Sequence, residues 1–105
     1  SQLSETSTGV AHDIAAIGEV VKKTPALLAV DGISGVGAME CRTDDWGVDL
    51  LACGSQKALM MPPGLAFLSV SEKAKKVMES KPAPPTYYFD LKKYLAKAAE
   101  NDTPY

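Results

Sequence analysis

The sequence has 105 residues, enough for one domain and no more. Hydrophobic residues make up 46% and charged residues 23%, which is typical of a globular domain, and the net charge of −2 gives no reason to expect a nucleic-acid or membrane partner. No stretch is apolar and unbroken enough to span a membrane as a helix. Cys41 and Cys53 form neither a disulfide framework nor a CxxC metal site, so we expect free thiols in a cytoplasmic protein without a bound metal.

The first half of the chain predicts one helix and two strands. Residues 3–9 are small and polar, as in a loop that leads into a helix, and residues 11–23 carry apolar side chains at helical spacing. Continuous apolar runs at 27–31 and 49–53 predict strands buried on both faces. The glycine-rich, irregular segment 32–47 between them is long enough for a crossover, so the two strands can be parallel.

The second half predicts a third strand and two more helices. Residues 65–70 form the strand, and Ser71 is a good N-cap for a helix over 72–80. A proline-rich linker at 82–86 precedes a second stretch of helical spacing over 87–100. Together with the first half, this order of helices and strands indicates an α/β layer.

Lys57 is the only charged residue between Asp49 and Glu72, and its neighbours are leucines, methionines and prolines. We expect such a lysine to be partly desolvated, which disfavours the charged ammonium form. A neutral amine attacks carbonyl groups, so the pattern fits a lysine that forms a Schiff base. From the residues alone, the pattern more often belongs to a lysine whose apolar stem crosses the loop and whose amine reaches solvent.

Asp31 ends a predicted buried strand, at the edge where α/β sheets bind ligands. Its carboxylate could pair with a protonated ring nitrogen of a cofactor, or it could start a turn before Gly32. The preceding segment SETSTG, residues 4–9, offers hydroxyl and backbone N–H groups ahead of a helix. Such a segment can bind a phosphate or serve as an ordinary helix cap.

Three motifs in this order resemble the class V pyridoxal-phosphate-dependent aminotransferases, in particular the alanine-glyoxylate and serine-pyruvate group. They are SETSTGV at 4–10, LLAVDGIS at 27–34 and WGVDLLACGSQKALMMPPGLAFLSVSEKA at 46–74, and YYFDLKKYL at 87–95 extends the similarity. The segment GSQKAL-x-x-PPG is the most specific part. The resemblance implies part of a fold-type I large domain, a mostly parallel sheet with helices on both faces, in which 65–70 is the antiparallel strand.

The resemblance also implies roles for five residues. Lys57 matches the lysine that holds pyridoxal 5′-phosphate as a Schiff base and moves a proton during the reaction. Asp31 matches the aspartate that keeps the ring nitrogen protonated, and Ile33 falls where an apolar side chain packs on the ring. Gln56 matches a ligand of the cofactor phosphate, and Thr6 matches a hydroxyl position near the ring hydroxyl or the phosphate.

The implied reaction is a ping-pong transfer of an amino group from a small amino acid, such as alanine or serine, to glyoxylate or pyruvate. The resemblance implies a homodimer, and we expect residues 1–105 to be the C-terminal part of the large domain, inactive without the remaining pieces of the enzyme. One alternative is another class V enzyme, such as a cysteine desulfurase, although those enzymes commonly have histidine where Gln56 stands. The other is a non-catalytic remnant of the fold, against which the presence of both Asp31 and Lys57 argues.

Overall fold

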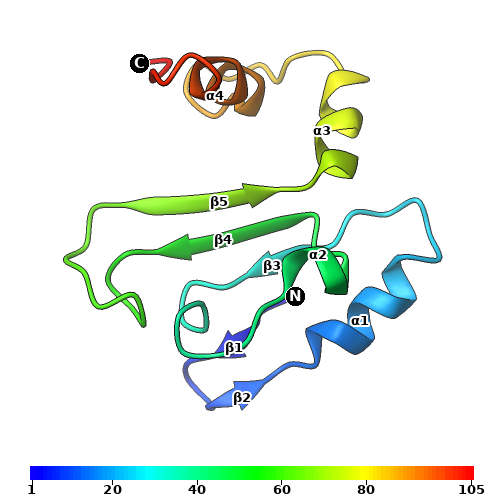
Figure 1. Ribbon diagram of the computed structural model, residues 1–105, viewed down its shortest axis with the longest axis vertical. Helices are drawn as coiled ribbons and strands as arrows, with labels where there is room; N and C mark the ends of the chain where they lie inside the picture. Colours follow the sequence, from blue (N-terminus) through cyan, green and yellow to red (C-terminus); the bar gives the residue numbers. More distant parts are fainter. The chain divides into compact units, whose positions relative to one another are not determined.

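The computed structural model describes all residues, 1–105, and divides them into two compact units, Ser1–Ala74 and Lys75–Tyr105 (Figure 1). In chain order, the elements are β1 (Ser4–Glu5), β2 (Val10–Ala11), α1 (Ile14–Val21), β3 (Ala29–Asp31), α2 (Thr43–Trp46), β4 (Leu50–Gly54), β5 (Ala66–Val70), α3 (Glu72–Glu79) and α4 (Leu91–Ala98). The first unit therefore contains every strand, and α3 begins in it. None of the helices has the length and apolar character that crossing a membrane requires.

The central sheet has three strands in the order β3-β4-β5. β3 runs parallel to β4, with Val30 opposite Leu51, and β5 runs antiparallel to β4, with Leu50 opposite Val70. The parallel pairing of the first two predicted strands and the antiparallel direction of the third are thus confirmed. The extended start of the chain adds a bridge, since Asp31 donates its backbone N–H to the carbonyl oxygen of Ser1 at 2.8 Å.

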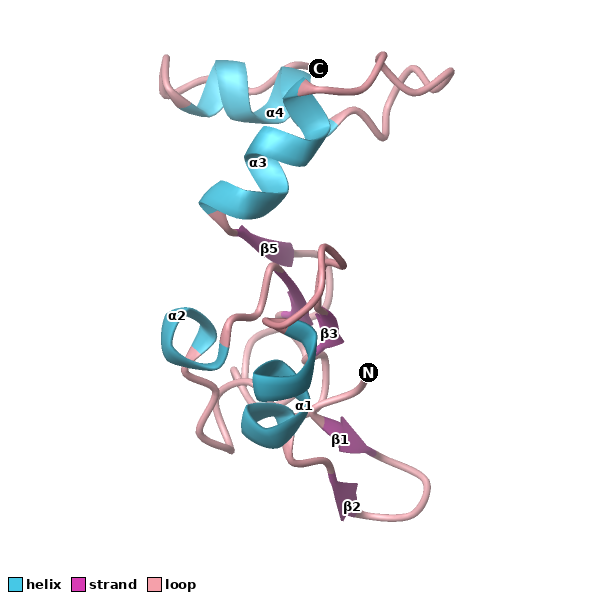
Figure 2. Cartoon of the chain, turned by 90° about the vertical axis from the view of Figure 1, so that its right-hand side faces the viewer, coloured by secondary structure: helices cyan, strands magenta, loops and turns pink.

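A small antiparallel hairpin of β1 and β2 occupies part of the segment expected to be a loop (Figure 2). Its turn is closed by a hydrogen bond of 2.8 Å from the N–H of Gly9 to the carbonyl oxygen of Glu5, with Gly9 at a φ of 70°. Strands of two residues are too short to show alternation in a sequence, so the pattern could not predict them.

Helix α1 confirms the helix predicted over 11–23, with shorter ends. Asp13 caps it by accepting the N–H of Ala16 at 2.9 Å, and Ile14 is only 1% exposed. α2 lies beside α1 and is a single unpredicted turn (Figures 1 and 2). A side chain at Gly18 would collide with the carbonyl oxygen of Trp46, so the close approach of the two helices requires glycine there.

The buried core lies on one face of β3. It consists of Leu3, Ile14, Leu28, Val30 and Val48, with Trp46 and other half-buried residues packed against it. Ala29 and Asp31, which alternate with the core residues of β3, are exposed. The expectation of strands buried on both faces is therefore wrong for this chain, because the core packs against only one face of β3.

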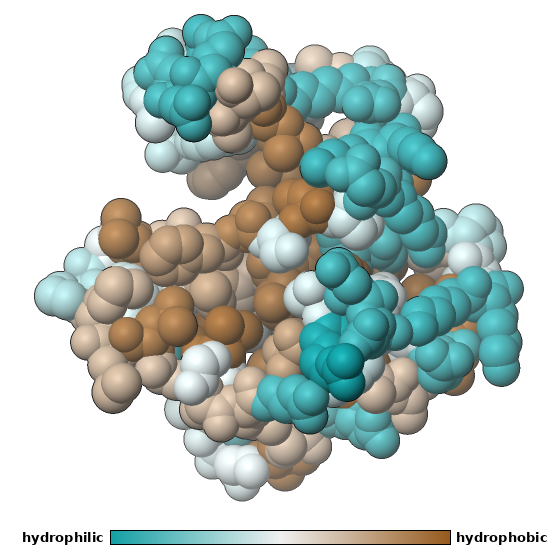
Figure 3. All heavy atoms as spheres, in the orientation of Figure 1, coloured by the Kyte–Doolittle hydropathy of each residue, from teal (hydrophilic) through white to brown (hydrophobic).

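Exposed apolar side chains gather around β5 and the connection before it, where brown surface is visible in Figure 3. The large exposed residues here are Met60, Met61, Leu65, Phe67 and Leu68. An apolar surface of this kind is unusual for a strand that faces water, since sheets normally bury such faces against other elements. Phe67 and Leu68 point to opposite faces of the strand, so β5 exposes apolar side chains on both of its faces.

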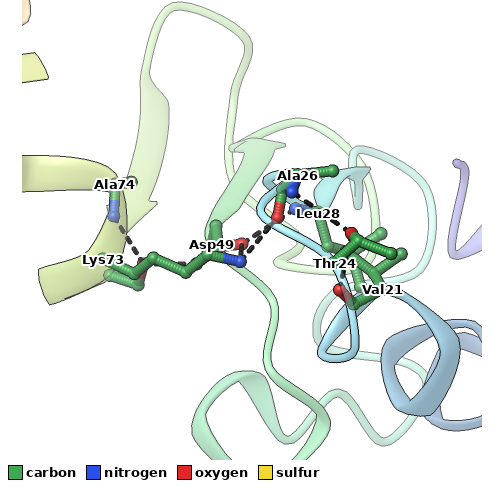
Figure 4. A network of polar contacts seen from close by, with 8 residues as sticks. Val21, Thr24, Ala26, Leu28, Asp49, Lys73 and Ala74 are labelled. Atoms are coloured by element: carbon green, nitrogen blue, oxygen red, sulfur yellow. Dashed lines mark hydrogen bonds and ion pairs between the residues drawn. The ribbon is translucent and has the colours of Figure 1, made fainter. Parts of the chain in front are cut away.

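A buried carboxylate joins three elements at the amino ends of β3 and β4 (Figure 4). Asp49 is 4% exposed and accepts the N–H of Leu28 at 2.9 Å and the hydroxyl of Ser71 at 2.7 Å. The amine of Lys73 lies 3.5 Å from the same carboxylate and donates to the carbonyl oxygen of Ala26 at 2.5 Å. Burial opposes ionisation of Asp49, but these hydrogen bonds and the Lys73 charge outweigh it and lower the pKa of the carboxyl group.

Both predicted C-terminal helices are present. Ser71 caps α3 by accepting the N–H of Ala74 at 3.0 Å, as expected. In the second unit, Asp90 caps α4 by accepting the N–H of Lys92 at 3.1 Å, so α4 begins at Leu91 instead of near residue 87. The residues before the cap are not helical.

Candidate functional site

The structure brings the sequence-predicted site residues to one edge of the sheet. Asp31 is the last residue of β3 and pairs with Ala52, and Lys57 follows Gly54, the last residue of β4, by three positions. Since β3 and β4 are parallel and adjacent, their carboxyl ends meet at this edge. Ligand sites of α/β sheets form at such an edge.

Lys57 lies at the start of a turn. The N–H of Met60 donates to its carbonyl oxygen at 2.9 Å, and Met60 itself has a φ of 54°. The Lys57 side chain is exposed and its amine makes no hydrogen bond or ion pair. The expectation that this lysine is partly desolvated is therefore wrong for this chain. The reason is that the apolar neighbours do not form a pocket around it: Met60 is 92% exposed and Met61 39%.

Asp31 starts a turn and keeps one oxygen available. Its Oδ1 accepts the N–H of Ile33 at 2.9 Å, while its Oδ2 makes no hydrogen bond. The turn-forming role is thus confirmed, and the carboxylate can still accept a second donor. Ile33, the residue expected against the ring, is 39% exposed beside it.

The loops that follow β3 and β4 pack against each other. Gly37 has a φ of 96°, and a Cβ built there would lie 3.1 Å from Leu59 Cδ2 and 3.3 Å from the carbonyl oxygen of Ala58. The glycine-rich loop after Asp31 therefore touches the two residues that follow Lys57. This contact holds the two candidate loops side by side.

The structure also shows where Thr6 and Gln56 lie. Thr6, in the β1–β2 turn, shares a hydrogen bond of 2.6 Å with the hydroxyl of Ser34, which ties this turn to the loop after Asp31. Gln56 is exposed, and its side chain folds back over Gly54, where a Cβ would lie 2.9 Å from Gln56 Oε1. All five predicted residues thus belong to segments that begin at the carboxyl edge or are bonded to it.

Two serines at this edge were missed by sequence reasoning. Ser34 is the partner of Thr6, and Ser55 is fully buried beneath the Lys57 turn. Nothing in a single sequence distinguishes Ser34 from another loop serine. For Ser55 a signal was present, because it follows a predicted buried strand and lies two positions before the candidate lysine.

Comparison with known proteins gives a family match over most of the chain. Residues 2–98 match the family model for class-V aminotransferases. The L-aspartate–glyoxylate aminotransferase of Paracoccus denitrificans is 46% identical over 104 residues, which cover 97% of this chain and 26% of that protein. The serine–glyoxylate aminotransferase of Hyphomicrobium methylovorum is 48% identical over 80 residues, covering 74% of this chain and 20% of that protein.

A solved structure has the same arrangement. The aspartate aminotransferase of subgroup IV from Thermus thermophilus superposes with a TM-score of 0.86 at 36% identity, over 99% of this chain and 29% of that chain. The fold expected from the sequence, part of an α/β large domain of this type, is therefore confirmed. The chain spans about a quarter of the length of the relatives that it matches.

Proposed function

Because this chain belongs to the class V aminotransferase family, whose cofactor is pyridoxal 5′-phosphate, we propose that it forms the lysine-bearing part of an aminotransferase. The reaction is the transfer of an amino group from a small amino acid to a 2-oxo acid. The observation that carries this proposal is the position of Asp31 and Lys57 at the carboxyl ends of two adjacent parallel strands. The segments around both residues also match the family, which favours a catalytic over a purely structural role.

The polar groups at this edge fit pyridoxal 5′-phosphate. The Lys57 amine has no protein partner and is the group to bond the cofactor aldehyde, and the open oxygen of Asp31 suits a protonated ring nitrogen. The exposed amide of Gln56 and the hydroxyl of Thr6 suit the phosphate or the ring hydroxyl. When bound, the cofactor supplies an electron sink for the carbanion of the substrate.

The residues of this chain then have distinct tasks. Asp31 would keep the ring nitrogen protonated by accepting a charge-assisted hydrogen bond from its N–H group. Lys57 would hold the cofactor through its amine, and the same amine would serve as the base that moves a proton. Ile33 provides an apolar surface for one face of the ring.

For the substrates, the names of the relatives suggest glyoxylate as amino acceptor, with aspartate or serine as donor in those proteins. We propose the same acceptor class here, with alanine, serine or a similar small amino acid as donor and pyruvate as a second possible acceptor. Donor and acceptor use the site in turn, in a ping-pong sequence. The residues that bind the substrate carboxylate are not among those assigned here.

The chain covers 26% and 29% of two of its relatives, which supports a role as part of a longer enzyme. We propose that residues 1–105 are the C-terminal part of the cofactor-binding large domain, that the remaining three quarters of the enzyme complete the site, and that the complete protein is a cytoplasmic homodimer. Residues 1–105 by themselves are then inactive. Light scattering on the full-length gene product tests the dimer. Transaminase activity of the full-length product, compared with that of the isolated chain, tests whether the remainder is needed.

The proposal is tested by covalent trapping. The full-length gene product that carries this chain is mixed with pyridoxal 5′-phosphate, reduced with borohydride and digested for peptide mapping. We expect a pyridoxyl group on Lys57. Lys73 serves as an internal control, because its amine is bonded to Ala26 and Asp49 at the opposite end of the sheet. Labelling of Lys57 with Lys73 unlabelled supports the proposal, whereas an unlabelled Lys57 in folded protein overturns it in favour of a non-catalytic remnant.

A further inference from the structure

The loop that carries Lys57 is closed at its base by a single buried residue. Ser55 is 0% exposed, and all of its polar groups are bonded within the segment 55–65. Its hydroxyl donates to the carbonyl oxygen of Pro62 at 2.6 Å and accepts the N–H of Leu65 at 3.3 Å. Its backbone N–H donates to the carbonyl oxygen of Leu65 at 3.0 Å, and its carbonyl oxygen accepts the N–H of Met61 at 3.0 Å.

Beyond Ser55, this loop is fixed by the packing of Ala58 and Leu59 against Gly37 and by one turn. Apart from those of Ser55, its hydrogen bonds are limited to the one from the N–H of Met60 to the carbonyl oxygen of Lys57, and Met60, Met61 and Leu65 are all exposed. Exposed apolar side chains contribute little packing energy that could fix the loop conformation. The position of Lys57, two residues after Ser55, therefore depends on how firmly the base of the loop is held.

We propose that Ser55 is a positioning residue for Lys57, through the two hydrogen bonds of its side-chain hydroxyl. The inference rests on the proposed role of Lys57 as the cofactor lysine. Replacing the hydroxyl leaves the two backbone bonds intact and removes only the bonds to Pro62 and Leu65, both formed at the far side of the loop. The carbonyl oxygen of Pro62 and the N–H of Leu65 then lose their protein partner, and the loop gains freedom at the point where it returns to β5.

Ser71 provides a matched control. Its hydroxyl also donates to one oxygen, Asp49 Oδ1 at 2.7 Å, and also accepts one backbone N–H, that of Ala74 at 3.0 Å. It lies at the opposite end of the sheet from Lys57. Ser55→Ala and Ser71→Ala thus delete equivalent hydroxyls, and general destabilisation affects both variants, whereas misplacement of Lys57 affects only the first.

The experiment uses the full-length gene product with and without cofactor. In cofactor-free protein, amide hydrogen exchange of the peptide that spans 55–65 reports the loop directly, independently of activity. In cofactor-loaded protein, the dissociation constant of pyridoxal 5′-phosphate, the pH midpoint of the cofactor absorbance change, kcat and KM are measured. We expect Ser55→Ala to accelerate exchange of the Leu65 N–H, to shift the absorbance midpoint and to lower kcat by about ten- to a hundredfold with a smaller change in KM. We expect Ser71→Ala to leave the exchange of this loop, the dissociation constant, the absorbance midpoint, kcat and KM at the wild-type level.

The outcomes separate this inference from the proposed function. If borohydride labels Lys57 in the wild type but the two serine variants behave alike, Ser55 is merely structural and the positioning role is wrong while the cofactor lysine stands. If the wild type is not labelled at all, the proposed function itself fails. Should Ser55→Ala be recovered unfolded, Ser55→Cys, which fills the same space with weaker hydrogen-bonding capacity, is put through the same measurements. Wild-type exchange and kcat in that variant would count against the inference.

Discussion

At the amino ends of β3 and β4, the carboxylate of Asp49 is 4% exposed and bonded to Leu28, Ser71 and Lys73, whereas at the carboxyl ends the charged groups of Asp31 and Lys57 are exposed. Each end contains one aspartate and one lysine on neighbouring segments. At the amino ends the aspartate and lysine interact with each other and with the backbone. At the carboxyl ends the amine is unpartnered and the carboxylate uses only one oxygen.

Under the proposed function, the same residue types serve stability at one end of the sheet and ligand binding at the other. A buried charge without partners is costly, so the partners of Asp49 stabilise the fold. Charges that bind a ligand need to be held by the backbone but left without protein partners, and the amine of Lys57 and one oxygen of Asp31 meet this condition. Substitutions at the carboxyl ends should therefore change chemistry without changing stability, and substitutions at the amino ends should do the reverse.

The largest expected effect is that of Lys57→Ala. Removing the amine should abolish borohydride labelling at this position and lower transamination by about 10²–10⁴-fold or more, because the covalent attachment and the proton transfer are both lost. The unfolding midpoint of the cofactor-free protein should stay at the wild-type value, since the side chain has no partner to lose. Lys73→Ala is the matched control and should retain activity while losing a small amount of stability, about 0.2–1 kcal/mol. If the Lys57→Ala protein kept its activity and was labelled at a different lysine, that other lysine would be the one that holds the cofactor.

Asp31→Asn tests the second residue at the carboxyl ends. The amide keeps the shape and can still accept the Ile33 N–H, but it carries no charge to hold a ring proton. We expect kcat to fall by about ten- to a hundredfold, comparable to the loss of one charge-assisted hydrogen bond. Steady-state kinetics and the cofactor absorbance spectrum measure the effect. An unchanged kcat together with a lowered unfolding midpoint would mean that Asp31 serves only its turn.

Asp49→Ala tests the amino ends. It leaves the buried N–H of Leu28 and the hydroxyl of Ser71 without their acceptor, and we expect the free energy of unfolding to fall by about 3 kcal/mol. Chemical denaturation of the cofactor-free protein measures this loss. Borohydride labelling of Lys57 in the fraction that remains folded should be unchanged. A loss of labelling with full stability would reverse the comparison between the two ends.

The smallest expected effect is a pH dependence of stability from Asp49. The pKa of this carboxyl group lies below its ordinary value of 3.8 in the folded protein, so the unfolded state binds a proton at higher pH than the folded state. The stabilisation is therefore fully present above about pH 4 and is lost as the pH falls through the lowered folded pKa. Asp49→Asn should flatten this part of the profile. Denaturation midpoints of the wild type and of Asp49→Asn, measured between neutral and acidic pH, test this. The same pH dependence in both proteins would contradict the assignment to Asp49.

Several parts of this protein could be read from its sequence because they depend on local patterns. Apolar runs predicted β3, β4 and β5, helical spacing predicted α1, α3 and α4, and Ser71 was recognised as a cap. The motif around Lys57 indicated the family, because a lysine, its preceding residues and the prolines after it occur within one continuous segment. The assignments of Thr6, Asp31, Ile33, Gln56 and Lys57 to the cofactor remain predictions.

Other parts were decided only by the tertiary structure. The exposure of Lys57 differs from the expectation because apolarity of neighbours in sequence does not determine whether they surround a side chain in space. The one-sided burial of β3 depends on which residues pack against it, and the closeness of the Lys57 loop to the glycine-rich loop depends on parallel strand pairing. Ser55 and the Asp49 network likewise bond residues up to 47 positions apart. The sequence by itself therefore determined the residue types and their order, whereas contacts between distant segments decided which charges are satisfied and which remain open to a ligand.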